Sequence, residues 1–363
     1  MSRTRLGRAR PTSRPRRWGS SGCRSRRSGR RRAGGDWALA RQDWDEAVRA
    51  YRYGLDAAGE LFRLHRLRSH RETWLQAVQT LPHNAAYALA RVGDLAGAAE
   101  TVEHGRALLL TEALQQRATA SPGAPAPVPP CPVVYLVASD AGGLALVARP
   151  DAGAVQHDVV WMPSLTRGAV ADRADALATA YGQRHADRSR WREALSTEGR
   201  WVWDAAVRPL TERFDAAEPL VLVPTGLLGQ IPLQAAWTPD GSFPTGRRYA
   251  VDALALVVAP NARSLTLRRP HLDLRAAPTL TVADPRPSSL PPLRHAAWEA
   301  RASSGPVSSP PALLGEDATL ANVRRALPRV SVAHFSCHGR ADVLEPLGSC
   351  LFLAGDEPLR GWA

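Results

Sequence analysis

The sequence predicts an α/β protein preceded by an all-α region, and three observations support this prediction. Residues 36–117 place small and apolar side chains at a helical spacing. Residues 118–131 are rich in proline and alanine, which ends helical structure and marks a linker between domains. Residues 132–363 contain short apolar runs separated by helical or loop crossovers, a pattern typical of strands in a largely parallel sheet.

A basic tail occupies residues 1–35, and we expect it to be disordered because it is almost free of apolar residues. Residues 1–33 hold 13 of the 47 basic residues and no acidic one, so the rest of the chain has 34 basic and 34 acidic residues. The charge therefore indicates no specific nucleic-acid partner for the folded part. Three interpretations of the tail stay open: a segment that binds acidic polymers, a mitochondrial-type presequence, or an upstream start in GC-rich DNA that is not translated.

The cysteines and the hydropathy pattern bear on the compartment. The four cysteines are scattered along the chain and form no disulfide framework: Cys23, Cys131, Cys337 and Cys350. No run of 18 apolar residues occurs, so we expect no membrane span. These features favour a cytoplasmic protein.

Residues 36–117 contain two helical units with the same arrangement of small residues. The first unit has a helix start at Asp43, followed by Ala47, Tyr51 and Gly54. The second repeats this spacing 51 residues later, at Ala98, Val102 and Gly105. The arrangement resembles TPR repeats, which implies a protein or peptide partner bound by the helices. A plain helical bundle is the alternative.

The segment after the linker begins with strands. Residues 133–139 and 144–149 flank the sequence DAGG, which predicts a hairpin, and residues 155–161 predict a third strand. An amphipathic helical pattern covers residues 164–215. Four apolar runs follow, which we expect to form a parallel sheet buried on both faces: residues 219–224, 253–260, 279–285 and 330–336.

The stretch SVAHFSCHGRAD, residues 331–342, brings together two histidines and a cysteine. Strand alternation places His334 and Ser336 on one face and Phe335 and Cys337 on the other, so Cys337 and His338 point apart. A Cys–His dyad needs sulfur and nitrogen about 3 Å apart, which this geometry does not give. Zinc is an alternative for His334, Cys337 and His338, but the alternation splits these three and a structural site needs four ligands. We therefore expect neither a metal nor a cofactor.

Five segments of this region resemble, in order, the CHAT domain, a caspase-like cysteine-peptidase domain related to caspases and separase. They are LVLVPTGLLGQIPLQAAW (220–237), RRYAVDALALVVAPNARSL (247–265), TLTVADP (279–285), ALLGEDATLANVRRAL (312–327) and VAHFSCHGRAD (332–342). The resemblance implies a three-layer α/β/α sandwich, a bacterial source and an endopeptidase that acts on a protein partner. CHAT domains often follow TPR repeats.

The resemblance also implies roles for particular residues. His338 corresponds to the catalytic base, and the N–H of Gly339 contributes to the oxyanion hole. The family's nucleophile is a cysteine at the end of the next strand, and no cysteine of this sequence matches it. Cys337 is expected to pack in the core, and Cys350 is expected to be a small buried or edge residue rather than a nucleophile. Asp284 and Asp342 are expected to shape a substrate pocket.

Three hypotheses about function follow. The chain resembles a cysteine endopeptidase that is expected to be inactive, because the domain stops before the strand that would carry the nucleophile. Alternatively, it is a non-enzymatic interaction module that uses the TPR-like helices and the CHAT sheet. The third hypothesis is a truncated gene product. The sequence gives no indication of the oligomeric state.

Overall fold

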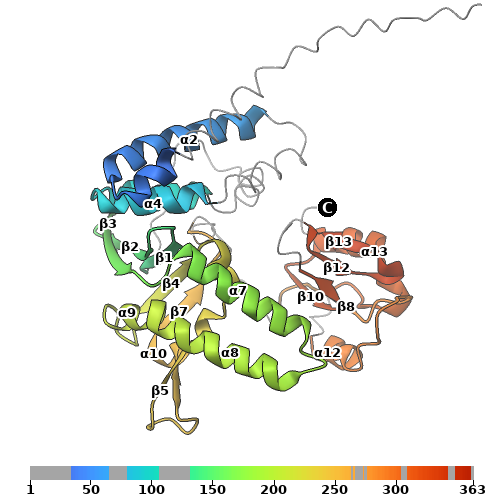
Figure 1. Ribbon diagram of the computed structural model, residues 1–363. Coiled ribbons are helices and arrows are strands. Elements are labelled where there is room, and N and C mark those ends of the chain that lie inside the picture. The colour runs from blue at the N-terminus through green and yellow to red at the C-terminus, as the bar shows by residue number, and fades with distance from the viewer. Residues whose placement is uncertain are drawn as a thin grey trace, which may run out of the picture. The chain divides into compact units, whose positions relative to one another are not determined.

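The structure is a computed structural model that describes residues 34–64, 80–105, 131–262, 265, 273, 276–303, 309–341 and 348–360. The chain forms two compact units, residues 1–267 and 268–363, each with its own sheets (Figure 1). Together they give the predicted α/β fold with a helical N-terminal region. The predicted tail up to residue 33 and residues 118–130 of the predicted linker lie outside the described residues.

The N-terminal helices form two helix–turn–helix pairs. The first consists of residues 34–40 and α2 (Trp44–Leu64), and the second of α4 (Leu81–Arg91) and α5 (Leu95–Gly105). In each pair an aspartate follows the turn and caps the second helix. Asp43 accepts a hydrogen bond from Glu46 N at 3.1 Å, and Asp94 accepts one from Gly97 N at 2.9 Å. The predicted helix start at Asp43 is therefore confirmed.

The small residues that repeat along these helices lie at close contacts. Ala47 and Ala98 are fully buried. A Cβ atom added to Gly54 would lie 3.3 Å from Leu81 Cδ2, and one added to Gly105 would lie 2.5 Å from Pro82 Cγ. Helices packed this closely leave no room for larger side chains. Whether the two pairs are TPR repeats stays a prediction.

The main sheet of the first unit has five strands in the order β3-β2-β1-β4-β7. Antiparallel pairing joins β1 to β2 and β2 to β3, whereas β1, β4 and β7 are parallel neighbours. The hairpin at DAGG and the third strand are thus confirmed. The strands are β1 (Val133–Ala138), β2 (Gly143–Asp151), β3 (Ala154–Met162), β4 (Pro219–Pro224) and β7 (Ala255–Val258).

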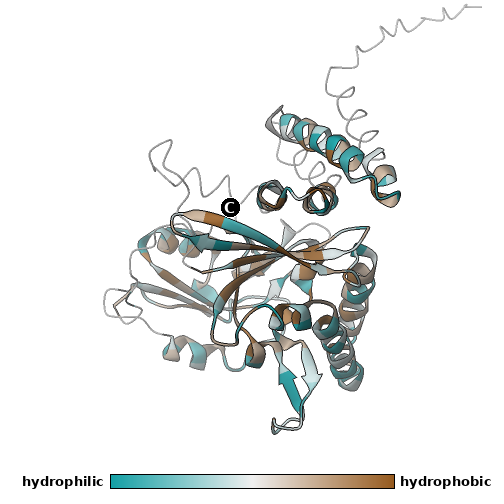
Figure 2. Cartoon of the chain, turned by 90° about the vertical axis from the view of Figure 1, so that its left-hand side faces the viewer, coloured by the Kyte–Doolittle hydropathy of each residue, from teal (hydrophilic) through white to brown (hydrophobic). Residues whose placement is uncertain are grey.

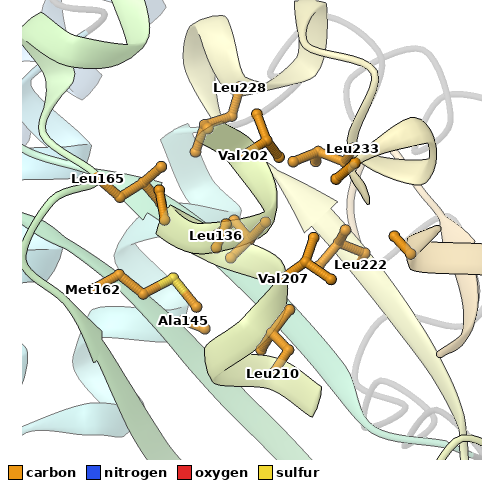
Figure 3. Packing of buried hydrophobic residues seen from close by; sticks show 14 of the residues in the cluster. Leu136, Ala145, Met162, Leu165, Val202, Val207, Leu210, Leu222, Leu228 and Leu233 are labelled. Carbon is orange, nitrogen blue, oxygen red and sulfur yellow. The ribbon is translucent and has the colours of Figure 1, made fainter. Parts of the chain in front are cut away.

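One face of this sheet packs against helices from the predicted amphipathic segment. These are α7 (Arg167–Gly182), α8 (Arg188–Val202), a π-helical turn (Trp203–Val207) and α9 (Arg208–Thr211). Leu136 and Leu222 of the strands meet Val202 and Leu210 of the helices in one hydrophobic cluster (Figure 3). The remaining elements are β5 (Trp237–Pro239), β6 (Arg247–Tyr249), α10 (Ala250–Ala253) and two 3-10 turns, Gly226–Gln230 and Leu233–Ala235.

The opposite face of the same sheet is covered by the N-terminal helices. Val133, Tyr135 and Val137 of β1 lie in one cluster with residues of α4 and α5. The strands carry mostly hydrophobic residues, shown brown in Figure 2. Alternate residues of β1 therefore serve two different cores, which makes β1 the centre of a layered unit.

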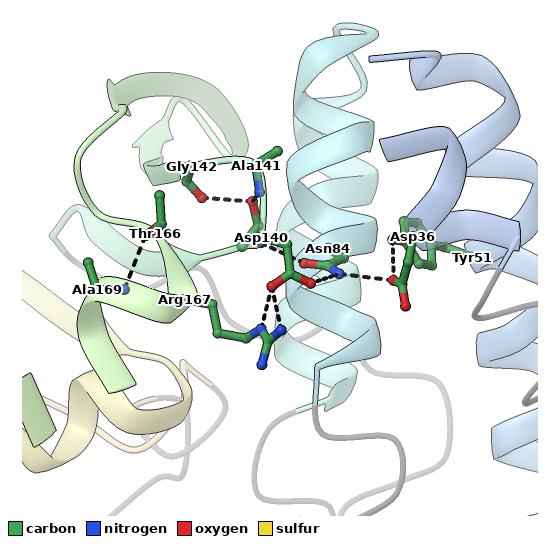
Figure 4. A network of polar contacts seen from close by, with 10 residues as sticks. Asp36, Tyr51, Asn84, Asp140, Ala141, Gly142, Thr166, Arg167 and Ala169 are labelled. Carbon is green, nitrogen blue, oxygen red and sulfur yellow. Dashed lines mark hydrogen bonds and ion pairs between the residues drawn. The ribbon is translucent and has the colours of Figure 1, made fainter. Parts of the chain in front are cut away.

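A buried polar network joins the N-terminal helices to the sheet (Figure 4). Asn84 of α4 is only 1% exposed. Its amide donates to Asp36 at 3.2 Å and to Asp140 at 2.8 Å, and its carbonyl accepts from Asp140 N at 3.0 Å. Tyr51 also donates to Asp36, at 2.7 Å. Burial, together with this hydrogen bond and the charge of Asp36, raises the pKa of Tyr51, so it acts as a neutral donor.

The second unit contains a parallel sheet of order β10-β8-β9 and an antiparallel sheet of order β11-β12-β13. Its strands are β8 (Thr279–Ala283), β9 (Leu313–Leu314), β10 (Val332–Ser336), β11 (Gly339–Arg340), β12 (Cys350–Phe352) and β13 (Pro358–Arg360). Its helices are α12 (Ala296–Ala302) and α13 (Leu320–Ala326), with 3-10 turns at Gly315–Asp317, Leu327–Arg329 and Ala354–Asp356.

The four apolar runs form parallel strands, but they divide between two sheets. Burial on both faces holds for β4 and β8 and is wrong for β7 and β10. The reason is position, because β7 and β10 each stand at the end of their sheet order. On β7, Val257 is 59% exposed and Val258 is 40% exposed.

No described helix is both long and apolar enough to cross a bilayer.

Asn84→Ala should destabilise the protein by about 2–3 kcal/mol, because it leaves buried groups of Asp140 and Asp36 short of partners. Urea unfolding followed by tryptophan fluorescence measures this change. The control is Asn322→Ala on α13. Asn322 also donates a hydrogen bond, to Asp317 O at 2.9 Å, but this bond is exposed, so water replaces it and the loss should stay below about 1 kcal/mol. Equal losses for both variants would contradict the buried network.

Candidate functional site

The candidate site lies at the carboxyl ends of β8 and β10 in the second unit. Ser336 of β10 pairs in register with Ala283 of β8, so the segments after both strands emerge side by side. Asp284 N donates to Ser336 O at 2.9 Å and holds these ends together. Side chains that follow parallel strands collect at this edge of a sheet. His338 follows one strand and Asp284 follows the other.

The ring of His338 is oriented by a main-chain acceptor. Its Nε2 lies 2.8 Å from the carbonyl oxygen of Pro291. Because a carbonyl can only accept a hydrogen bond, this contact assigns the proton to Nε2. The other nitrogen, Nδ1, is then the one that can accept a proton. The contact therefore fixes both the tautomer and the orientation of the His338 ring.

The loop that supplies this carbonyl is fixed from within by Asp284 and Arg286. Asp284 Oδ1 accepts from Arg286 Nη2 at 2.8 Å and from Leu293 N at 3.1 Å. Arg286 Nη1 donates to Leu290 O at 3.0 Å. These bonds hold the main chain on both sides of Pro291. Sequence reasoning missed Arg286, because its role depends on how the loop folds.

A second anchor ties the same loop to the turn before β13. Asp356 accepts hydrogen bonds from the Ser288 hydroxyl at 2.6 Å and from Ser289 N at 3.0 Å. These two partners, in that order, lower the pKa of Asp356. Gly355 N donates to Pro287 O at 2.7 Å. The loop is therefore held at both of its ends.

The charge of Asp284 is set by its neighbours. Partial burial opposes ionisation, but the hydrogen bonds from Arg286 and Leu293 and the charges of Arg286 and His338 together lower its pKa. Asp284 thus stabilises the loop when ionised, above about pH 4, and this stability is lost as the pH falls through its folded pKa. Its expected place in a substrate pocket stays a prediction. Asp342 lies outside the described residues.

The N–H of Gly339 is oriented by the pairing of β11 with β12. Phe352 N donates to His338 O at 2.8 Å, and Gly339 faces Leu351 in the antiparallel register. Hydrogen-bonded and non-hydrogen-bonded pairs alternate in such a ladder. The pair of Gly339 and Leu351 is therefore non-hydrogen-bonded, and the Gly339 N–H points away from β12. Outside the strand ladder, no hydrogen bond from this N–H occurs among the described residues.

The described cysteines differ from an activated nucleophile. Burial raises the pKa of Cys337 to about 11, and no described hydrogen bond joins it to His338. Cys350 is buried on β12. Cys131 lies in the first unit, and burial raises its pKa also. Cys350 is buried, whereas Cys337 is only partly buried, and its packing role stays a prediction.

His334 and Ser336 share one face, as the strand alternation predicted, and they meet Glu299 of α12 there. His334 Nε2 lies 3.3 Å from Ser336 Oγ and 3.9 Å from Glu299 Oε2, and the Ser336 hydroxyl donates to Glu299. Sequence reasoning missed Glu299, since nothing local indicates that α12 covers β10. No group of three or more metal-ligating side chains occurs among the described residues.

Part of the chain matches a known protein family. Residues 196–361 match the CHAT domain. The CHAT segment begins inside α8 and includes β4, β7, β8 and β10. His338, Gly339 and Asp284 all lie within it. The resemblance to the CHAT domain is thus supported for this part of the chain, and no curated protein matches the chain.

Arg286→Ala should loosen the Pro291 carbonyl and increase the share of His338 that carries its proton on Nδ1. Long-range proton–nitrogen NMR of the neutral ring measures the two tautomers. The matched control is Arg294→Ala, an exposed arginine of the same loop that should leave the spectrum unchanged. A wild-type ring protonated mainly on Nδ1, or the same spectrum in both variants, would contradict the assigned orientation.

Cys337 should react slowly with iodoacetamide at neutral pH. A rise of its pKa from 9.0 to about 11 reduces the thiolate fraction about a hundredfold, and only the thiolate reacts. Mass spectrometry of alkylated peptides gives the rate for each cysteine. The Cys337 rate should be the same in His338→Ala. A fast rate that falls in His338→Ala would instead make Cys337 the nucleophile.

Proposed function

We propose that the CHAT segment carries part of the site of a caspase-like cysteine endopeptidase that acts on a protein partner, with His338 as the general base and without the nucleophile. The observation that carries this proposal is the hydrogen bond from His338 Nε2 to the Pro291 carbonyl. It leaves Nδ1 as the proton acceptor at the edge where parallel strands end. The match to the CHAT domain supports the same reaction class.

The reaction would use His338 to transfer protons and the Gly339 N–H to stabilise the oxyanion. Nδ1 of His338 would take the proton from a cysteine thiol, and the thiolate would attack the scissile carbonyl of the partner. The N–H of Gly339, which points away from β12, would then stabilise the oxyanion. His338 would then give the proton to the leaving amine as the C–N bond breaks, and a water deprotonated by His338 would hydrolyse the remaining thioester and free the thiol.

The nucleophile in this proposal is none of the described cysteines. Cys337 is held as a thiol by burial, and Cys350 is buried on β12. The chain by itself is therefore proposed to be inactive. Asp284 and Asp342 are proposed to line the substrate pocket, where a basic side chain of the partner would compete with Arg286 for Asp284.

A peptide-cleavage experiment tests this proposal. The full chain is incubated with a proteome-derived peptide library, and new termini are identified by mass spectrometry. We expect no cleavage that depends on His338. Cleavage by the wild type that is lost in both His338→Ala and Cys337→Ser would overturn the assignment of the nucleophile. Cleavage that persists in His338→Ala would overturn the assignment of the base.

A non-enzymatic interaction module is the second candidate, and the unactivated cysteines favour it. A partner that co-purifies equally with the wild type and with His338→Ala would support this function. Deleting residues 36–117 is unsuitable as a test, because it would uncover Val133, Tyr135 and Val137 of β1. Point variants on the described surface are needed instead.

A further inference from the structure

A pocket of about 240 Å³ lies in the first unit, where three segments meet. The turn before α2 contributes Gln42, the first residue of α2 contributes Trp44, and α4 contributes Tyr87 and Arg91. The β1–β2 turn contributes Asp140. These residues precede the CHAT segment, so a site here would be independent of the function proposed above.

Arg91 is held at this pocket by aromatic rings rather than by an acid. Its guanidinium carbon lies 5.0 Å from the ring centre of Trp44 and 4.9 Å from that of Trp161. Cation–π contacts of this kind position the group while its N–H donors stay unused. Among the described residues Arg91 has no carboxylate partner. Its positive charge is therefore available to a ligand.

Asp140, the acidic residue that lines the pocket, already has hydrogen-bond partners. Asp140 accepts from Arg167 Nε at 2.6 Å and from the Asn84 amide at 2.8 Å (Figure 4). Both of its carboxylate oxygens thus have partners, and its charge is balanced by Arg167. Asp140 shapes the wall of the pocket without neutralising Arg91.

Tyr87 provides a second donor one helical turn before Arg91. Its side chain is 7% exposed, and its ring packs against Trp44 and Trp161 at centroid distances of 5.9 and 5.4 Å. Its hydroxyl has no hydrogen-bond partner in the described part of the chain, and it is not among the buried unpartnered atoms, so it keeps access to solvent and to a ligand. Residues four apart lie on one helix face. Tyr87 and Arg91 both line the pocket.

Gln42 adds a polar group in a costly backbone conformation. Its φ is +61°, whereas Gly93 has φ +87° in the turn of the second helix pair. A left-handed conformation is unfavourable for a residue with a side chain, whereas glycine adopts it readily. The first turn nevertheless keeps a side chain, and that side chain lines the pocket. Buried Leu39 supplies an apolar wall.

From this arrangement we infer that the pocket binds a carboxylate carried on a group about the size of one apolar residue. One guanidinium and one hydroxyl match a single negative charge with two oxygens. A phosphate dianion fits less well, because its second charge would have no counterion beside Asp140. The apolar flank of the ligand would contact Leu39 and Trp44. A peptide C-terminus and a free carboxylic acid share this chemistry.

Isothermal titration of the full chain tests the inference with four probes. These are N-acetyl-leucine, N-acetyl-leucine amide, the tripeptide Ala-Ala-Leu and inorganic phosphate. We expect binding of the two carboxylates, and at least tenfold weaker binding of the amide and of phosphate. Tighter binding of the tripeptide than of N-acetyl-leucine would identify a peptide C-terminus as the source. Equal binding would identify a small carboxylic acid.

Three variants locate the site. Arg91→Gln should weaken carboxylate binding at least tenfold, and Tyr87→Phe, which keeps the ring packing, should weaken it about threefold to tenfold. Arg49→Gln on the exposed face of α2 is the matched control and should bind as the wild type does. Urea midpoints confirm that each variant is folded. Equal affinity for acid and amide, unchanged binding in folded Arg91→Gln, or no carboxylate binding at 10 mM would overturn the inference.

Discussion

Strand β1 is apolar on both faces, and the rest of the first unit depends on this constraint. Val134 and Leu136 point into one core, and Val133 and Tyr135 point into the other. A strand of this kind must be covered twice. The helices α7 and α8 provide one cover, and the N-terminal helices provide the second. Helices that resemble a free-standing repeat therefore serve as a layer of the α/β unit. Their inner faces are therefore occupied by contacts with the sheet.

In the second unit, the main structural constraint is the orientation of the His338 imidazole ring. His338 leaves β10 in a segment that does not by itself fix the ring. The fixing atom is the Pro291 carbonyl, and the loop around it is held by Asp284, Arg286 and Asp356. These anchors come from three separate stretches of the chain. The orientation of the His338 ring is thus a tertiary feature, although His338 itself belongs to a short local motif.

Local patterns predicted much of this fold. The DAGG hairpin, the helix start at Asp43 and the parallel direction of β4, β7, β8 and β10 follow from turn chemistry, capping and apolar runs. The division of those strands between two sheets does not, because the exposure of β7 and β10 depends on which strands pair with them. In the site, His338 and Gly339 were predicted through a family resemblance. Glu299 and Arg286 were not, because each acquires its partners only when distant segments meet.

The contact between His338 and a main-chain carbonyl has a consequence for how such proteins diverge. A carbonyl is present whatever residue occupies position 291, so substitutions there leave the acceptor in place. It also has no ionisable proton, so the acceptor itself does not titrate. Sequence variation at position 291 would therefore say little about whether the His338 ring is held by this carbonyl. Variation at Asp284 and Arg286 would be more informative, because these two residues hold the loop that presents the Pro291 carbonyl to His338.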